Sequence, residues 1–240
     1  MMPTFAILAG GIATRLHPLT ENIPKAMLEV AGKPFISHQF VLLKNNGISR
    51  VIICSGYLSK QIEDFVGDGK KFGLSVEFSR DGDEPLGTGG AIKKALPLLG
   101  EVFFVMYGDS YLDVYFKPIS DYFMSFKKKG MMTVLKNKDK WDNSNIIFNN
   151  GMVAEYDKKM KKPGMEYIDY GLSVLRQGAF DKFSRRESFD LSELYRTLAQ
   201  EGQMLGYEVK NRFYEIGSPQ GLKETEEYLS GKTREFNYGY

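Results

Sequence analysis

The chain has 240 residues, enough for one sizeable domain with a small subregion. Lysine and arginine total 32, and aspartate and glutamate total 30. The resulting net charge of +2 argues against a nucleic-acid or membrane-surface protein. The one cysteine, Cys54, excludes an intrachain disulfide, and no run of about 18 apolar residues predicts a transmembrane helix. These features favour a cytoplasmic protein with neither nucleic acid nor membrane among its partners.

Strand-like apolar runs and helical spacings alternate along the first part of the chain. This rhythm predicts an α/β fold with a doubly wound, mostly parallel, Rossmann-like sheet. From Ile146 onward shorter strands take over, around a hairpin turn at Asn149-Asn150-Gly151. The predicted strands are Phe5–Ala9, Val51–Ser55, Leu74–Phe78, Val102–Tyr107, Met131–Leu135, Ile146–Phe148, Met152–Tyr156, Leu172–Leu175 and Met204–Val209. The predicted helices are Phe35–Asn46, Lys60–Val66 with Ser59 as its cap, Thr88–Leu99, Ile119–Lys129, Gly178–Phe183, Leu191–Gln200 and Pro219–Leu229.

A glycine-rich loop with two cations follows the first predicted strand. Gly10-Gly11 lets the backbone approach a ligand, and Arg15 and Lys25 come next along the chain. Uncovered backbone N–H groups and two cations suit a polyphosphate. The loop is neither G-x-x-x-x-G-K-[ST] nor the dinucleotide fingerprint G-x-G-x-x-G. It therefore indicates a nucleoside triphosphate site of another kind.

The segment from Leu8 to Lys25 resembles the signature of the sugar-1-phosphate nucleotidylyltransferases, G-G-x-G-T-R-L-x-P-L-T-x-x-x-P-K. Ala13 stands where that family most often has a third glycine, and this argues against a positive φ at the position. The resemblance extends to about Leu222. The matching positions, in order and spacing, are Gly10, Gly11, Thr14, Arg15, Leu16, Pro18, Leu19, Thr20, Pro24 and Lys25.

This resemblance implies a reaction in which an NTP and a sugar 1-phosphate give an NDP-sugar and pyrophosphate. Arg15 and Lys25 would be the catalytic residues, at the leaving phosphates and the α-phosphate respectively. It also implies a single domain at 1–231, with a nucleotide half at about 1–136 and a tail at 232–240. A small C-terminal β subregion, at about 137–218, would bind the sugar.

A second glycine-rich string, Glu84 to Ala91, opens a predicted helix. Taken alone it could be a flexible turn, but it resembles the family's E-x-P-L-G-T-[AG]-G, whose backbone borders the nucleobase and ribose. The resemblance thus implies a nucleotide-binding set made of Leu8, Ala9, Gly10, Gly11, Glu84, Pro85, Gly87, Thr88 and Gly89.

Two acids are candidate ligands of a Mg²⁺ cofactor. Asp109 directly follows a buried strand, and Mg²⁺ is usually held by one or two carboxylates plus substrate phosphates. Glu215 lies in a segment similar to the family's D-I-G-T-P, with glutamate for aspartate and Ser218 for threonine. The alternatives are a turn-capping role for Asp109 and a surface carboxylate at Glu215.

The sugar side is implied by two weaker similarities. Asp157-Lys158 matches the end of the family's V-x-x-x-E-K, although Lys158 could also belong to a surface lysine cluster. Asp169-Tyr170-Gly171 stands where the family often has N-A-G, and the bulk of Tyr170 leaves the shape of the pocket open. The predicted sugar-phosphate-binding residues are Gly108, Asp157, Lys158, Asp169 and Gly171.

The substrates are the least determined part of the prediction. The string Glu84–Gly90 looks most like that of guanylyltransferases for mannose- or heptose-type 1-phosphates, which favours GTP and such a sugar. A cytidylyl- or uridylyltransferase acting on another sugar, or on a non-sugar phosphate, is one alternative. A nucleotide-binding regulatory subunit that has lost turnover is another. A homodimer is also left open.

Overall fold

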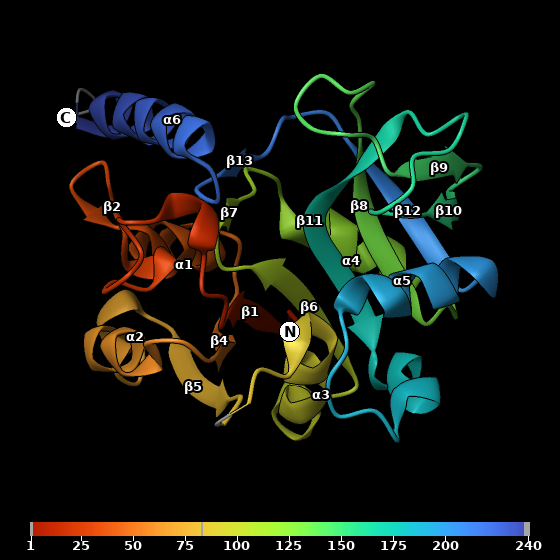
Figure 1. The fold of residues 1–240 in the computed structure, drawn as a ribbon, viewed down its shortest axis with the longest axis horizontal. Helices are drawn as coiled ribbons and strands as arrows, with labels where there is room; N and C mark the ends of the chain where they lie inside the picture. The colour runs from red at the N-terminus through yellow and green to blue at the C-terminus, as the bar shows by residue number, and fades with distance from the viewer. Residues whose placement is uncertain (1, 83, 238–240) are drawn as a thin grey trace.

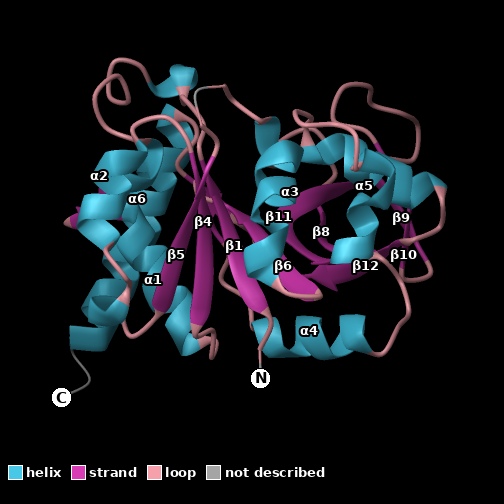
Figure 2. Ribbon diagram, turned by 90° about the horizontal axis from the view of Figure 1, so that it is seen from below, coloured by secondary structure: helices cyan, strands magenta, loops and turns pink. Residues whose placement is uncertain are grey.

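The computed structural model describes residues 2–82 and 84–237, which form a central sheet with helices on both faces (Figures 1 and 2). Its nine strands are ordered β5-β4-β1-β6-β11-β8-β12-β10-β9. Their bounds are β1 Thr4–Ala9, β4 Arg50–Ser55, β5 Ser75–Arg80, β6 Val102–Tyr107, β8 Gly130–Lys136, β9 Ile146–Asn149, β10 Met152–Tyr156, β11 Tyr167–Arg176 and β12 Met204–Val209. The α-helices are α1 Phe35–Asn45, α2 Ser59–Val66, α3 Gly87–Leu99, α4 Phe116–Met124, α5 Leu191–Gln200 and α6 Pro219–Asn237.

The first four strands in space, β5, β4, β1 and β6, are all parallel. Because their carboxyl ends meet at one edge of the sheet, the loops that follow them converge there. This part of the sheet agrees with the predicted parallel, helix-covered arrangement.

The other part of the sheet is mixed, so the prediction of a mostly parallel sheet is wrong there. Strand β11 runs antiparallel to both β6 and β8, and β10 runs antiparallel to both β9 and β12. Only β8 and β12 pair in parallel among the described strands of this half. A parallel pair needs a long crossover connection, and the short links between β9 and β10 do not provide one.

Two apolar cores lie on the two faces of the sheet. Within β1, Phe5 and Ile7 face the core covered by α1 and α4, and Ala6 faces the core covered by α3 and α5. This alternation follows from the two-residue period of a strand. All three side chains are fully buried, which fixes β1 at the centre of the nucleotide half.

Several predicted boundaries moved for identifiable reasons. Helix α4 begins before the predicted Ile119, because Pro118 sits in its first turn, where a missing N–H costs little. Helix α2 has Leu58 rather than Ser59 at its N-cap, with a left-handed φ of 53°. Helix α6 runs on to Asn237, so residues 232–237 are helical rather than a loosely held tail, and 238–240 lie outside the described residues.

A two-stranded ribbon and the last helix bring the C-terminal part of the chain into contact with its N-terminal half. Strands β7 (Ser110–Tyr111) and β13 (Tyr214–Glu215) form an antiparallel pair separate from the main sheet. Helix α6 then packs back against the N-terminal half, beside the hairpin of β2 (Glu29–Val30) and β3 (Lys33–Pro34) (Figure 1). No helix within 2–82 and 84–237 combines the length and apolarity needed to cross a membrane.

Candidate active site

A cavity of about 640 Å³ opens at the carboxyl edge of the parallel strands. Seven of the predicted nucleotide-binding residues line it, namely Leu8, Ala9, Gly10, Gly11, Pro85, Gly87 and Thr88. Lys25, Gly108 and Asp109 line it as well. Glu84 is exposed and Gly89 is buried, and neither lies among the residues that line the cavity.

The turn of the signature loop contradicts one expectation. Ala13 adopts φ 58° and ψ 42°, the left-handed conformation that the sequence argued against. Its carbonyl accepts hydrogen bonds from the backbone N–H of Leu16 at 3.0 Å and the buried hydroxyl of Thr20 at 2.9 Å. These bonds hold the turn in a conformation that costs an alanine more than a glycine.

The second glycine-rich string uses its glycines mainly for packing within the protein. A Cβ on Gly89 would lie 2.3 Å from the ring of Phe189, and a Cβ on Gly90 would lie 2.3 Å from the carbonyl oxygen of Glu187. Gly89 therefore lets α3 approach the segment before α5, rather than a ligand. Thr88 accepts from the N–H of Leu191 at 2.8 Å, which joins the start of α3 to the start of α5.

The β7–β13 ribbon brings the two predicted metal-ligating acids together. Ser110 pairs with Glu215 across it, and the N–H of Ile216 donates to the carbonyl of Asp109 at 2.9 Å. A side chain on Gly217 would begin 3.0 Å from Oδ2 of Asp109 and 2.8 Å from Oε2 of Glu215. Two carboxylates far apart in the sequence thus approach one point beside the cavity.

Both predicted catalytic cations reach the same place. The Nζ of Lys25 lies 2.8 Å from Oδ2 of Asp109, in a pair whose side chains are 18% and 26% exposed. A guanidinium nitrogen of Arg15 lies 3.4 Å from the point where a Gly217 side chain would begin. The arrangement combines two anions and two cations, as expected where charged phosphates are handled.

Glu215 is held from behind by the start of α6. Its carboxylate accepts from the N–H of Gly217 and from the hydroxyl of Ser218. Gly221 provides the space, because a Cβ there would lie only 1.7 Å from Oε1 of Glu215. The extra methylene of glutamate, compared with the family's aspartate, therefore fits only because residue 221 has no side chain.

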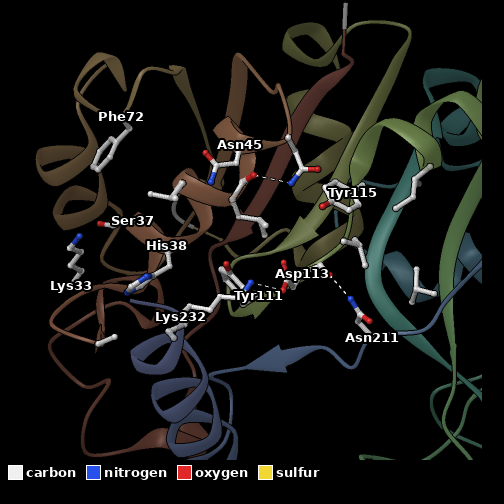
Figure 3. Close-up of a pocket in the computed structure, with 18 of the residues that line it drawn as sticks. Lys33, Ser37, His38, Asn45, Phe72, Tyr111, Asp113, Tyr115, Asn211 and Lys232 are labelled. Atoms are coloured by element: carbon white, nitrogen blue, oxygen red, sulfur yellow. Dashed lines mark hydrogen bonds and ion pairs between the residues drawn. The ribbon is translucent and has the colours of Figure 1, made fainter. Parts of the chain in front are cut away.

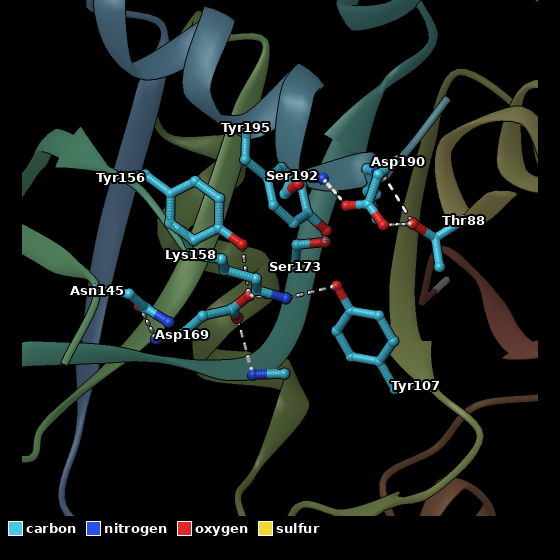
Figure 4. Close-up of polar contacts among 12 residues, drawn as sticks. Thr88, Tyr107, Asn145, Tyr156, Lys158, Asp169, Ser173, Asp190, Ser192 and Tyr195 are labelled. Atoms are coloured by element: carbon cyan, nitrogen blue, oxygen red, sulfur yellow. Dashed lines mark hydrogen bonds and ion pairs between the residues drawn. The ribbon is translucent and has the colours of Figure 1, made fainter. Parts of the chain in front are cut away.

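On the other side of Asp109, polar groups gather between β6, β11 and α5 (Figure 4). The ammonium of Lys158 lies 3.4 Å from the hydroxyl of Tyr107 and 3.7 Å from Oδ2 of Asp169. Burial, with Asp169 and Asp190 adding to it, raises the pKa of Tyr107 well above its ordinary value, so the hydroxyl remains a hydrogen-bond donor. Lys158 is exposed, but its ammonium belongs to this polar cluster.

Of the other residues predicted to bind the sugar phosphate, some lie beside this polar cluster and others only stabilise the fold around it. Gly171, at φ 98°, lies against Ser110 and Tyr107, where β11 approaches the loop that carries Asp109. Tyr170 points to the opposite face and packs edge-on against Phe213, so its bulk does not enter the cluster. Asp157 accepts from the N–H groups of residues 159 and 160 and lies near Arg196, which makes it a turn-stabilising residue here.

Several residues of these sites were missed from the sequence, among them three with polar side chains. Asp81 follows β5 and lines the cavity of about 640 Å³. This cavity is called the nucleotide cavity from here on, because most of the predicted nucleotide-binding residues line it. Tyr107 is the last residue of β6, and the apolar run that predicts this strand gives no sign that its hydroxyl belongs to a site. Asp190 caps α5, where its carboxylate accepts from the N–H of Ser192 at 2.8 Å and from the hydroxyl of Thr88 at 3.2 Å. The S-x-x-E-like pattern of a capping box, here Asp190 with Glu193, was the one available signal.

A second hollow, of about 1190 Å³, contains none of the predicted site residues (Figure 3). It lies between α1, α4 and α6, on the side of the β7 ribbon away from the nucleotide cavity. His38 lines it, and burial lowers the pKa of that imidazole. The larger hollow is therefore not the place where the signature loop meets the acid pair, Asp109 and Glu215.

The fold and the site define a nucleotidyl transferase. Residues 5–230 match the family described as Nucleotidyl transferase, and the chain belongs to that family. It is 29% identical over 219 residues to the mannose-1-phosphate guanyltransferase beta-B of Xenopus laevis, covering 89% of this chain and 61% of that one. It is 28% identical over 217 residues to the D-glycero-alpha-D-manno-heptose 1-phosphate guanylyltransferase of Campylobacter jejuni, covering 89% and 94%. The chain thus spans about three fifths of the length of the first of these relatives.

Solved structures give the same result for the fold. HddC from Yersinia pseudotuberculosis complexed with GMP-PN has a TM-score of 0.81 and 26% identity, over 95% of this chain and all of that one. The inositol-1-phosphate CTP transferase from T. maritima has a TM-score of 0.76 over 95% and 96%. At 21% identity, the second likeness shows the fold alone.

Proposed function

We propose that this protein transfers GMP from GTP to a manno-configured sugar or heptose 1-phosphate, giving a GDP-sugar and pyrophosphate. The observation that carries the proposal is the convergence of Asp109, Glu215, Lys25 and Arg15 beside a cavity lined by the signature loop. The names of the relatives in Xenopus laevis and Campylobacter jejuni support the guanine base and the manno-type sugar.

In this mechanism an oxygen of the sugar phosphate attacks the α-phosphorus of GTP in line, and pyrophosphate leaves from the opposite side. Such a reaction needs positioning and charge neutralisation rather than a covalent intermediate. Arg15 neutralises the leaving β,γ-phosphates, and Lys25 turns from Asp109 towards the α-phosphate. Lys158, oriented by Tyr107 and Asp169, holds the incoming sugar phosphate.

The family's Mg²⁺ fits the residues present. Asp109 and Glu215 offer hard carboxylate oxygens close to one point, and each has lone pairs beyond the hydrogen bonds that it accepts. Two carboxylates with substrate phosphates make an ordinary Mg²⁺ donor set, and a bound Mg²⁺ would supply charge neutralisation between the two substrates.

The test is a pyrophosphate-release assay of four NTPs against a panel of acceptors. The panel holds mannose, heptose and glucose 1-phosphates together with a non-sugar acceptor, choline phosphate. We expect GTP with a manno-type acceptor to give a kcat/KM at least about tenfold above the other pairs. If a pyrimidine triphosphate is preferred tenfold over GTP, the proposal that the substrate base is guanine is wrong. Absence of release with every pair would leave the regulatory-subunit alternative.

A further inference from the structure

One residue of the nucleotide cavity has no role in the chemistry described so far. The strands β5, β4, β1 and β6 end side by side, and the residues that follow three of them are Asp81, Gly56 and Gly10. Asp109 follows β6 at the other end of this row. Neighbouring strands lie about 4.8 Å apart, so Asp81 is roughly 14 Å from the acid pair. Lys25 and Arg15 lie towards one end of the cavity, and Asp81 stands at the other, with Lys94 on its backbone carbonyl.

The position of Asp81 is fixed by its backbone. Its N–H donates to the carbonyl of Ser55 at 2.9 Å, and its own carbonyl accepts from Lys94 at 3.0 Å. Its Oδ2 lies 3.4 Å and 3.3 Å from the points where side chains on Gly10 and Gly56 would begin. The two glycines therefore leave the carboxylate uncovered on the side of the cavity.

The carboxylate of Asp81 lacks a cationic partner within residues 2–82 and 84–237. None of the ion pairs in that part of the chain includes it, and Lys94 binds its carbonyl instead. Burial raises the pKa of this half-buried carboxyl, and the backbone N–H of Leu86 and the nearby charge of Lys94 oppose the effect. Such a group gains most from a ligand that brings neutral N–H or O–H donors, because polar groups removed from water must be hydrogen-bonded.

We propose that Asp81 selects the nucleobase, its two carboxylate oxygens accepting the N1–H and the 2-amino group of guanine. This inference rests on the proposed function, since it assumes that the cavity binds an NTP. A triphosphate is not the group expected at Asp81, because like charges repel and the two cations of the signature loop, Arg15 and Lys25, lie at the far end. The base is the neutral, donor-bearing end of the nucleotide.

The donor pattern of the bases makes the selection sharp. A carboxylate is acceptor-only and binds best to two adjacent donors. Guanine has such a pair. Uracil has one N–H between two carbonyl oxygens that repel a carboxylate, and cytosine and adenine each place a ring acceptor beside their amino group. Each of these bases would leave one carboxylate oxygen unpaired or facing another acceptor.

The experiment compares GTP with ITP, which differs only by lacking the 2-amino group. In the wild-type protein we expect kcat/KM for GTP to exceed that for ITP by about tenfold to a hundredfold, the value of one hydrogen bond to a charged group. Asp81→Asn replaces one acceptor with a donor, and we expect it to reduce this ratio to about threefold or less. Asp64→Asn, the same change at an exposed position on α2, should keep the wild-type ratio.

The outcomes separate this inference from the proposed function. If the wild type uses GTP but Asp81→Asn keeps its GTP-to-ITP ratio, the role of Asp81 is refuted and the reaction stands. If the ratio of GTP to 2′-deoxy-GTP changes instead, Asp81 contacts the ribose and the inference is also refuted. If GTP is not a substrate, the proposed function fails first. Because the ratio is internal to each variant, a partly unfolded Asp81→Asn sample still gives a valid answer.

Discussion

Replacing Gly221 by alanine should displace the Glu215 carboxylate and so disable the site. The new Cβ would lie 1.7 Å from Oε1, 2.4 Å from Cδ and 2.7 Å from the carbonyl oxygen of Glu215. Contacts under 3.0 Å cannot persist, and the Glu215 carbonyl is fixed by a 2.8 Å bond from Thr225. The carboxylate must therefore leave the hydrogen bonds that it accepts from Gly217 and Ser218.

These contacts set the size of the expected change in stability and in activity. Losing two hydrogen bonds to a charged group costs about 3–6 kcal/mol. Alanine in place of glycine in a helix returns up to about 1 kcal/mol. The free energy of unfolding should thus fall by about 2–6 kcal/mol. Pyrophosphate release should fall about 10²-fold, as for the loss of a transition-state charge partner.

Two matched variants make this experiment decisive. Gly231→Ala lies on the same helix, with nothing within 4 Å of the new Cβ, and should keep full activity. Glu215→Asp combined with Gly221→Ala should recover part of the loss, because the shorter acid removes the contacts with Oε1 and Cδ and leaves only the 2.7 Å contact with the carbonyl oxygen for the helix to relieve by a small shift. Wild-type turnover in Gly221→Ala would refute the argument that the placement of the Glu215 carboxylate matters.

Four further outcomes are expected. Asp109→Asn should lower pyrophosphate release by about 10²-fold or more while calorimetry still detects bound GTP, whereas unchanged turnover would exclude Asp109 as a reacting-site acid. Lys25→Ala should lower kcat more than it raises the Kd for GTP, and equal effects would make Lys25 a simple anchor. Ala13→Gly should raise the free energy of unfolding by about 0.5–1 kcal/mol in denaturant titrations, and a decrease would contradict the strain assigned to its left-handed backbone. Backbone N–H donors hold the pKa of Asp157 below its ordinary 3.8, so its stabilisation is present above that pH and lost as the pH falls through the folded-state pKa. The difference in Tm between wild type and Asp157→Ala should accordingly shrink from pH 7 to pH 3, and a constant difference would exclude this carboxylate as its source.

The sequence was most informative where short segments decide the structure. The parallel strands β1, β4 and β6 are continuous apolar runs, and β6, β10, α5 and β12 begin and end where the pattern predicts. The signature loop was found for the same reason, since Gly10, Gly11, Arg15 and Lys25 lie within one short segment. The proximity of Asp109 and Glu215 was predicted through the family resemblance alone, because nothing local in either segment encodes the β7–β13 pairing.

Features that depend on distant packing were missed. Gly89 looked like a ligand-facing glycine, but its open side is filled by Phe189 from a remote segment. The antiparallel insertion of β11 between β6 and β8 leaves no trace in the periodicity of either neighbour. Asp81 stands in a polar loop like many others, and only the order of strands across the sheet places it in the cavity.

The ribbon that carries the acid pair also sets an order of events during synthesis. Among the described residues, those that line the nucleotide cavity lie between Leu8 and Asp109, whereas Glu215 comes much later in the sequence. A polypeptide leaves the ribosome N-terminus first, so the nucleotide-lining residues emerge well before the second acid does. The nascent chain has no complete reaction centre until β13 pairs with β7. In the proposed mechanism, pairing of these two short strands is the step at which a binding surface becomes capable of turnover.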